Sequence, residues 1–217
     1  MIERTIATGT HGRYIIEPPA SAGPAPVLFG FHGYAEGAEA QLERMRAIPG
    51  AGRWRLVAVQ GLHRFYQRRE NQVIASWMTR QDRELAIADN LAYVEGVMRD
   101  VEKEWPGAPR VVLAGFSQGV AMVYRVAAAA SRPVDGVIAV GGDVPPELDA
   151  AALARVPSAL VCRGERDEWY TTDKFDNDIG RLREAGVAVR PLAFDGGHEW
   201  ADEVISAASL FLNEPPL

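Results

Sequence analysis

Residues 111–119 read VVLAGFSQG, and this stretch decides the fold class. Its apolar run is typical of a buried strand, and the following residues, 117–130, have the composition of a helix. Ser117 stands between Gly115 and Gly119 at the junction. G-x-S-x-G between a strand and a helix describes a nucleophile elbow, a strained turn that presents a serine oxygen at the sheet edge. The glycines let the strand and helix approach closely.

Strands and helices alternate on both sides of this stretch. Apolar runs predict strands at 27–31, 54–61, 110–114, 136–140, 158–162 and 187–194, with helices over 38–48, 82–105, 146–156, 171–186 and 198–213 between or after them. This alternation predicts an α/β fold with a mostly parallel sheet and helices on both faces. Residues 4–19, RTIATGTHGRYIIEPP, predict an N-terminal antiparallel hairpin. No repeat or linker divides residues 1–217, so we expect one domain.

Composition excludes several classes of partner. The chain is 47% hydrophobic with a net charge of -6, so it can bury a core but has no bulk attraction for nucleic acid or anionic membranes.

Cys162 is the only cysteine, which excludes an internal disulfide and fits a reducing compartment. The N-terminus lacks the apolar core of a signal peptide, and no apolar run approaches the roughly 18 residues of a membrane span. We expect a cytoplasmic protein.

Polar residues gather where the predicted strands end, and in such sheets functional groups lie at the carboxyl ends of the strands. Ser117, Asp167 and His198 each follow a strand, in that order along the chain. A serine hydroxyl needs a base within hydrogen-bond reach, and the base needs an orienting acid. The sequence therefore predicts Ser117 as nucleophile, His198 as base and Asp167 as acid.

Acyl transfer also needs donors for the oxyanion and a pocket for the acyl group. The backbone amide of Gln118, directly after the nucleophile, is one candidate donor, and that of Tyr34, after His32-Gly33, is the other. Trp77 and Trp169 are predicted to bind substrate by lining an apolar acyl pocket.

At these residues the sequence resembles the α/β-hydrolases, and among them the phospholipase/carboxylesterase family that includes acyl-protein thioesterases. The resemblance runs from FGFHGYAEGAE (29–39) through AGFSQGVAM (114–122) and CRGERDEW (162–169) to the GGHEW segment that begins at 196. It implies the same triad and the same two oxyanion donors. Two segments depart from the family pattern: Ala35-Glu36-Gly37 stands where a G-D pair is usual, and ASWMTRQDREL (75–85) differs after its tryptophan.

Simpler interpretations compete with the catalytic one. Ser117 could serve only as a helix N-cap, and Asp167 only as a turn carboxylate. Asp143 also follows a strand and is the reserve acid, whereas Asp195 reads as a turn residue. His32 is interpreted as structural. Four scattered histidines and one cysteine give no metal-ligand spacing, and no G-x-G-x-x-G or P-loop is present, so we expect no metal and no cofactor.

The arginine-rich stretch 62–80 is the least regular part of the sequence. It reads either as a solvated loop or as a rim where Arg64, Arg68 or Arg69 meets an acidic substrate group. It is also a candidate surface for a homodimer.

Together these features predict a serine hydrolase that cleaves carboxylic esters of small or medium acyl chains, with little or no lid. One alternative is a thioesterase acting on acyl-thiol conjugates, which would share the triad. Another is a protein that binds a small ligand on a hydrolase scaffold without turning it over. A dienelactone-hydrolase-like enzyme normally has cysteine at the nucleophile position, which Ser117 does not supply.

Overall fold

A seven-stranded sheet in the order β1-β3-β2-β6-β7-β8-β9 forms the centre of the computed structural model, which describes residues 1–67 and 71–214. The strands are β1 (Arg13–Glu17), β2 (Val27–Phe31), β3 (Arg55–Gln60), β6 (Val111–Phe116), β7 (Gly136–Val140), β8 (Ser158–Gly164) and β9 (Ala188–Phe194). Neighbouring strands are parallel throughout, except that β1 is antiparallel to β3. The predicted mostly parallel sheet is confirmed.

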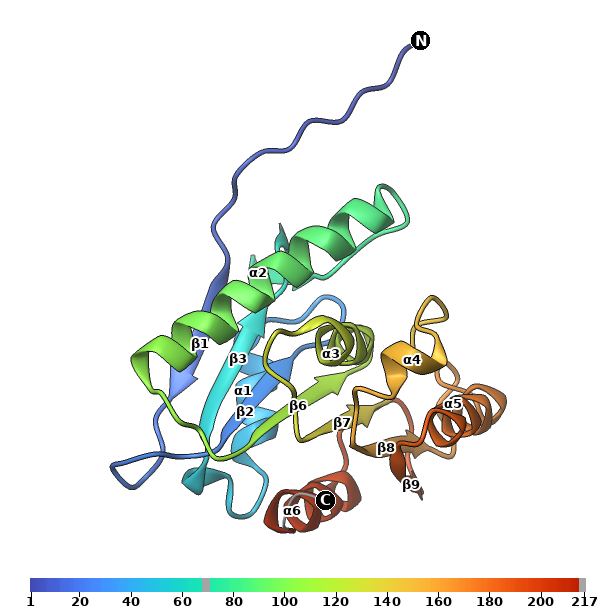
Figure 1. The fold of residues 1–217 in the computed structure, drawn as a ribbon. Helices are drawn as coiled ribbons and strands as arrows, with labels where there is room; N and C mark the ends of the chain where they lie inside the picture. Colours follow the sequence, from blue (N-terminus) through green and yellow to red (C-terminus); the bar gives the residue numbers. More distant parts are fainter. Residues whose placement is uncertain (68–70, 215–217) are drawn as a thin grey trace.

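Helices cover both faces of this sheet (Figure 1). They are α1 (Ala38–Arg46), α2 (Arg83–Glu104), α3 (Gln118–Ala129), α4 (Ala150–Leu153), α5 (Thr172–Glu184) and α6 (Asp202–Asn213), with a 3-10 turn η1 (Ala51–Arg53) before β3. One apolar cluster packs α2, α3 and α5 against one face, and a second packs α1 and α6 against the other.

The strand sequences explain this double covering. Phe29 and Phe31 of β2 join the cluster under α2 and α3, whereas Leu28, which precedes Phe29 and points to the opposite face of the sheet, joins the cluster under α1 and α6. All five residues of β2 are buried. A strand buried on both faces reads as a continuous apolar run, which is why its bounds were predictable from the sequence.

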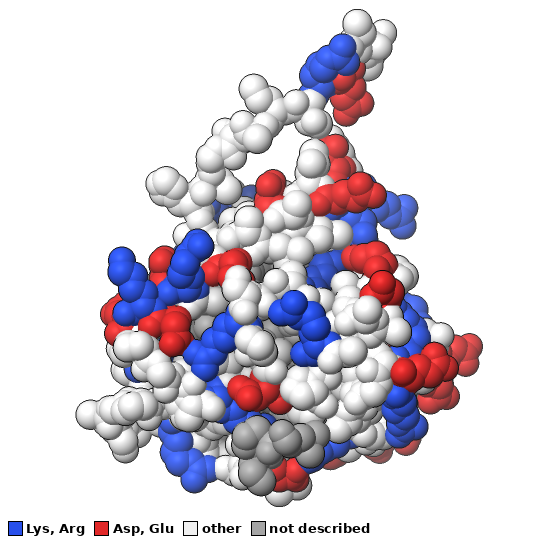
Figure 2. All heavy atoms as spheres, in the orientation of Figure 1, with Lys and Arg blue, Asp and Glu red and all other residues white. Residues whose placement is uncertain are grey.

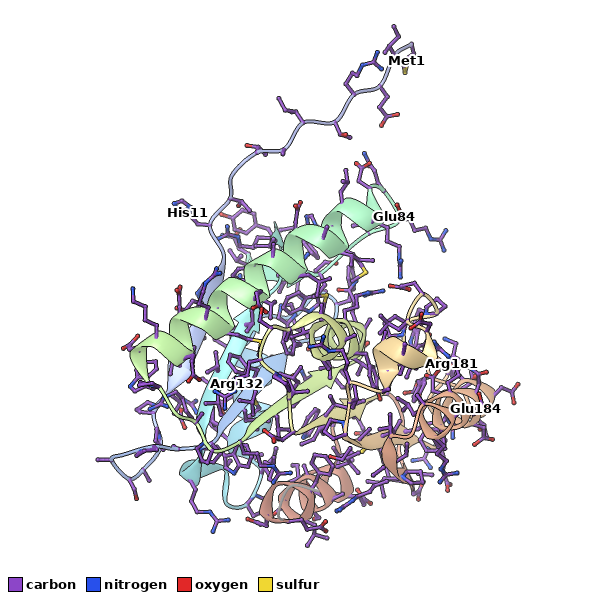
Figure 3. All side chains as sticks on the ribbon, viewed as in Figure 1. Met1, His11, Glu84, Arg132, Arg181 and Glu184 are labelled. Atoms are coloured by element: carbon purple, nitrogen blue, oxygen red, sulfur yellow. The ribbon has the colours of Figure 1, made fainter. Side chains whose placement is uncertain are left out.

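The N-terminal antiparallel pairing is present, but its partner differs from the prediction. β1 pairs with β3, and residues 1–12 have no regular secondary structure. Figure 3 shows this segment, from Met1 to His11, extending away from the body of the molecule. A hairpin here would have no core to pack against, whereas the edge of β3 offers β1 five paired positions beside a packed sheet.

The stretch predicted as an irregular loop contains two short strands. β4 (His63–Tyr66) and β5 (Val73–Ser76) form an antiparallel two-stranded sheet beside the main one. Ile74 and Ala75 are buried, and Glu36 forms an isolated β-bridge to Ala75. This small sheet is therefore fastened to the loop after β2 by a contact between segments distant in the sequence.

The surface mixes charges of both signs. On the face drawn in Figure 2, basic and acidic side chains are interspersed. Within residues 1–67 and 71–214, no helix combines the length and apolar character needed to cross a membrane.

Candidate active site

Ser117 sits at the turn between β6 and α3, in a backbone conformation that is rare for a residue with a side chain. Its φ of 53° and ψ of -119° lie outside the usual regions, and its amide donates to the Val140 carbonyl at 2.9 Å. Ser117 occupies the N-cap position of α3, but its side chain makes no capping hydrogen bond. The strained turn directs the hydroxyl away from a capping contact with α3, as a nucleophile elbow requires.

The glycines that flank this turn permit close packing of backbone on backbone. A Cβ at Gly119 would lie 2.1 Å from the carbonyl oxygen of Phe31, at the end of β2. One at Gly115 would lie 2.7 Å from the Val123 side chain on α3. The first contact is with backbone, which cannot rotate away, so α3 can approach β2 this closely only because residue 119 lacks a side chain.

The structure brings together the three residues predicted to form a triad. His198 Nε2 lies 2.8 Å from Ser117 Oγ, and His198 Nδ1 lies 2.8 Å from Asp167 Oδ2. Because the carboxylate can only accept at Nδ1, the neutral ring carries its proton there and presents a lone pair to the serine hydroxyl. His198 lies in the loop before α6, which begins at Asp202, and does not open that helix as predicted.

Asp167 is held by its own loop. Its side chain is 1% exposed, and its Oδ1 accepts from the backbone amides of Trp169 at 2.8 Å and Tyr170 at 2.9 Å. These bonds leave Oδ2 to face His198. A buried carboxylate with three donors is fixed in position, which is what orienting an imidazole requires.

Tyr34 and Gln118 carry the two backbone amides predicted to bind the oxyanion. In the part of the chain that the structure describes, neither the Tyr34 nor the Gln118 amide has a hydrogen-bond partner. The Gln118 amide is the first of α3, where a helix offers unsatisfied donors and a partial positive charge. Both residues line the same pocket as Ser117 and His198.

Trp77 does not line that pocket, so its predicted role in substrate binding is wrong. Its side chain is 0% exposed, its indole N–H donates to the His32 carbonyl at 2.9 Å, and its ring packs 5.1 Å from the His32 ring. The indole therefore supports the loop after β2 from within the core. Burial lowers the pKa of His32, whose Nε2 accepts from the Gly61 amide, in agreement with its structural interpretation.

The Gln118 side chain has a role that the sequence did not indicate. Its Oε1 accepts from the Trp77 amide at 2.9 Å and the Ser76 hydroxyl at 3.2 Å, and its Nε2 donates to the Met78 carbonyl at 3.0 Å. The glutamine thus fastens the segment after β5 to the start of α3. Nothing in residues 76–78 marks them as its partners, because the contact spans about forty positions.

The pocket above Ser117 has a volume of about 500 Å3, within the usual range for small-molecule sites. Its lining comprises Tyr34, Ser117, Gln118, Ala121, Gly141, Gly142, Asp143, Trp169, Lys174 and His198. Trp169, predicted to bind substrate, lies in this wall with 75% of its surface exposed. Lys174 was not predicted as a site residue. The one sequence feature that sets it apart is its residue type, because only two of the 23 basic residues are lysines.

The alternative acids make other contacts. Asp143 lines the pocket but pairs with Lys174 at 3.2 Å, and Asp195 pairs with Arg166 on the surface.

Arg64, one of three arginines predicted to meet an acidic substrate group, instead donates to the His11 carbonyl at 2.8 Å and is not in the pocket wall. The other two, Arg68 and Arg69, lie outside the described residues.

Comparison with solved structures shows which known proteins share this fold. The chain is similar to esterase PE8 with a TM-score of 0.75 and 20% identity, over 94% of this chain and 98% of that one. The chain has the α/β-hydrolase fold. A carboxylesterase from Mesorhizobium loti has a TM-score of 0.72 at 20% identity, over 88% of this chain and 89% of that one. One from Bacillus cereus has a TM-score of 0.73 at 15% identity, over 92% of each chain.

Comparison of the sequence with family models gives a match to the middle of the chain. Residues 73–174 match the model of the phospholipase/carboxylesterase family. The match confirms the predicted resemblance and the predicted enzyme class, a carboxylic ester hydrolase. No curated protein matches the sequence.

Proposed function

We propose that this α/β-hydrolase cleaves carboxylic esters of small or medium acyl chains with Ser117 as nucleophile, His198 as general base and Asp167 as orienting acid. The observation that carries the proposal is the continuous hydrogen-bonded chain from Ser117 Oγ through both nitrogens of His198 to Asp167 Oδ2, with 2.8 Å at each step. A serine, a base and an orienter at these separations form the arrangement that activates a hydroxyl for acyl transfer.

The reaction has two steps. His198 Nε2 takes the hydroxyl proton as Ser117 Oγ attacks the ester carbonyl, and the resulting imidazolium is stabilised by Asp167. The proton then passes to the departing alcohol, which leaves an acyl-enzyme. In the second step His198 takes a proton from water, the hydroxide attacks the acyl carbonyl, and the proton returns to Ser117 as the acid is released.

The amides of Tyr34 and Gln118 are proposed to bind the oxyanion in both steps. Preorganised donors of this kind are each worth on the order of 10²–10³ in kcat, because they face charge that develops only in the transition state. The partial positive charge at the first turn of α3 acts in the same direction. Trp169, in the exposed wall of the pocket, is proposed to contact the substrate.

The test is hydrolysis of p-nitrophenyl esters from acetate to dodecanoate by wild type, Ser117→Ala and a control, Ser206→Ala. Ser206 donates only to a carbonyl of its own helix, so the control is expected to keep wild-type activity. We expect turnover that peaks at a short or medium chain and falls several orders of magnitude in Ser117→Ala. Near-full activity of folded Ser117→Ala would contradict the proposal. A thioester of the preferred acyl group, assayed beside the ester, tests the thioesterase alternative.

A further inference from the structure

Glu36, part of the segment that departs from the family pattern, binds the loop that carries an oxyanion donor. Its Oε2 accepts from the Gly33 amide at 2.7 Å. On the other side of Tyr34, the Ala35 amide donates to the Ala75 carbonyl at 3.0 Å. The amides on both sides of Tyr34 are therefore engaged, and within 33–35 the Tyr34 amide alone has no partner among the described residues.

Arg44 of α1 holds the Glu36 carboxylate in place. Its two terminal nitrogens donate to the two carboxylate oxygens at 2.6 Å each, in a planar fork. The two side chains are only 19% and 23% exposed, so water screens the pair weakly. Burial alone would raise the pKa of Glu36, but the hydrogen bonds and charge of Arg44, together with the Gly33 amide, lower it on balance. Glu36 is thus an anion.

The same guanidinium reaches the base through an aromatic ring. The Arg44 guanidinium carbon lies 4.2 Å from the centre of the Phe116 ring, and that ring lies 5.0 Å from the ring of His198. Phe116 immediately precedes Ser117. A cation stacked on an aromatic face holds the ring in place, so Arg44 supports both the loop of Tyr34 and the ring packed against His198.

We propose that the Glu36–Arg44 ion pair is a positioning device for catalysis: it fixes the Gly33–Ala35 loop so that the Tyr34 amide faces the oxyanion, and it fixes Phe116 against His198. Neither residue lines the pocket, so each acts through another group. The inference rests on the proposed function. The proposal explains why an acid stands at position 36, because a two-pronged contact with a partly buried arginine needs a carboxylate.

The test compares Glu36→Ala and Arg44→Met with a control, Glu43→Ala. Glu43 is also on α1 and also pairs with an arginine, Arg46, at 2.5 Å, but its side chain is 69% exposed. For each variant, kcat and KM are measured on the preferred p-nitrophenyl ester, together with inhibition by n-butylboronic acid. The boronic acid forms a tetrahedral adduct when Ser117 Oγ bonds to boron, so it reports on oxyanion binding. Circular dichroism and thermal melting show whether each variant is folded.

We expect folded Glu36→Ala and Arg44→Met to lose about tenfold in kcat, because a displaced donor loses most of its effect on the transition state. KM should stay within about twofold, and boronate affinity should fall by the same factor as kcat/KM. Glu43→Ala should match wild type in all three. A purely structural pair would lower the melting temperature without this shared loss of kcat and boronate affinity.

Two results would overturn the inference: wild-type kcat in a folded variant, or a lower kcat with unchanged boronate affinity. If Glu36→Ala does not fold, Arg44→Met carries the test with the same criteria. Failure of the proposed function would appear separately, as wild-type hydrolysis that does not depend on Ser117.

Discussion

The elbow around Ser117 and the wall of the pocket above it differ in how firmly they are held. The elbow turns between the fully buried strand β6 and the buried first turn of α3, and backbone packs on backbone at Gly119. The wall is exposed: Tyr34 shows 60% of its surface and Trp169 75%. The proposed reacting groups are thus placed on a rigid frame, whereas the proposed substrate contacts lie where a side chain can change without disturbing the fold.

This contrast predicts that changes to the frame abolish catalysis or folding, whereas changes to the wall alter substrate preference. Among the four variants that follow, the largest effect is expected for Asp167→Asn. The amide oxygen can still accept from the Trp169 and Tyr170 amides, which places the NH2 group toward His198 and favours the wrong imidazole tautomer. We expect kcat to fall on the order of 10⁴-fold in a folded protein, measured with the preferred ester. Asp195→Asn, at a surface ion pair, is the control. Equal activity of the two variants would contradict the assignment of the acid.

Gly119→Ala tests the frame itself. Its Cβ would lie 2.1 Å from the Phe31 carbonyl oxygen, so α3 or β2 must shift, and we expect a loss of about 3 kcal/mol in unfolding free energy. Gly180→Ala is the matched control, since a Cβ there meets nothing within 4 Å on helix α5 and should stabilise the protein by up to about 1 kcal/mol. Urea unfolding measures both. A Gly119→Ala protein as stable as wild type would show that the close packing is not required.

Gln118→Ala separates the two functions of one residue. The backbone amide, proposed as an oxyanion donor, remains, but the Trp77 amide loses its acceptor. We expect about 1–2 kcal/mol lower unfolding stability, because an unpaired buried donor keeps its desolvation penalty. The loss of kcat should be small beside that of Asp167→Asn. Thermal melting and ester kinetics check this; unchanged stability would mean that the glutamine does not hold the 76–78 segment.

Trp169→Ala should have the smallest effect. The indole is mostly exposed, and the backbone amide that binds Asp167 is kept. We expect KM for the longer p-nitrophenyl esters to rise about threefold from lost apolar contact, with an unchanged melting temperature. Leu210→Ala, exposed on α6, is the control. A uniform fall in kcat for every ester would instead assign Trp169 to the frame.

The same contrast shows what could be predicted from the sequence. Strands buried on both faces, such as β2 and β7, were found within a residue because their signal is local: a continuous apolar run. The fold class and the residues at the strand ends, Ser117, Asp167 and His198, follow from that alternation. Their roles remain predictions for the experiments above.

The errors arose where long-range contacts decide the structure. Trp77 is a core residue because its indole meets the His32 carbonyl, 45 positions away in the chain. β5 is fastened by the bridge from Glu36 to Ala75, which no local pattern in the polar stretch indicates. The partner of β1 is set by the open edge of β3 and not by the nearby turn residues.

The central claim, that Ser117 is acylated during turnover, can be tested directly by mass spectrometry. The protein is mixed with p-nitrophenyl acetate, quenched in acid within the first turnovers and digested. We expect a peptide containing Ser117 that is heavier by one acetyl group, absent in Ser117→Ala and strongly reduced in His198→Ala. Ester hydrolysis with no acetyl on Ser117 under any quench time, or an equal amount of adduct in His198→Ala, would contradict the account.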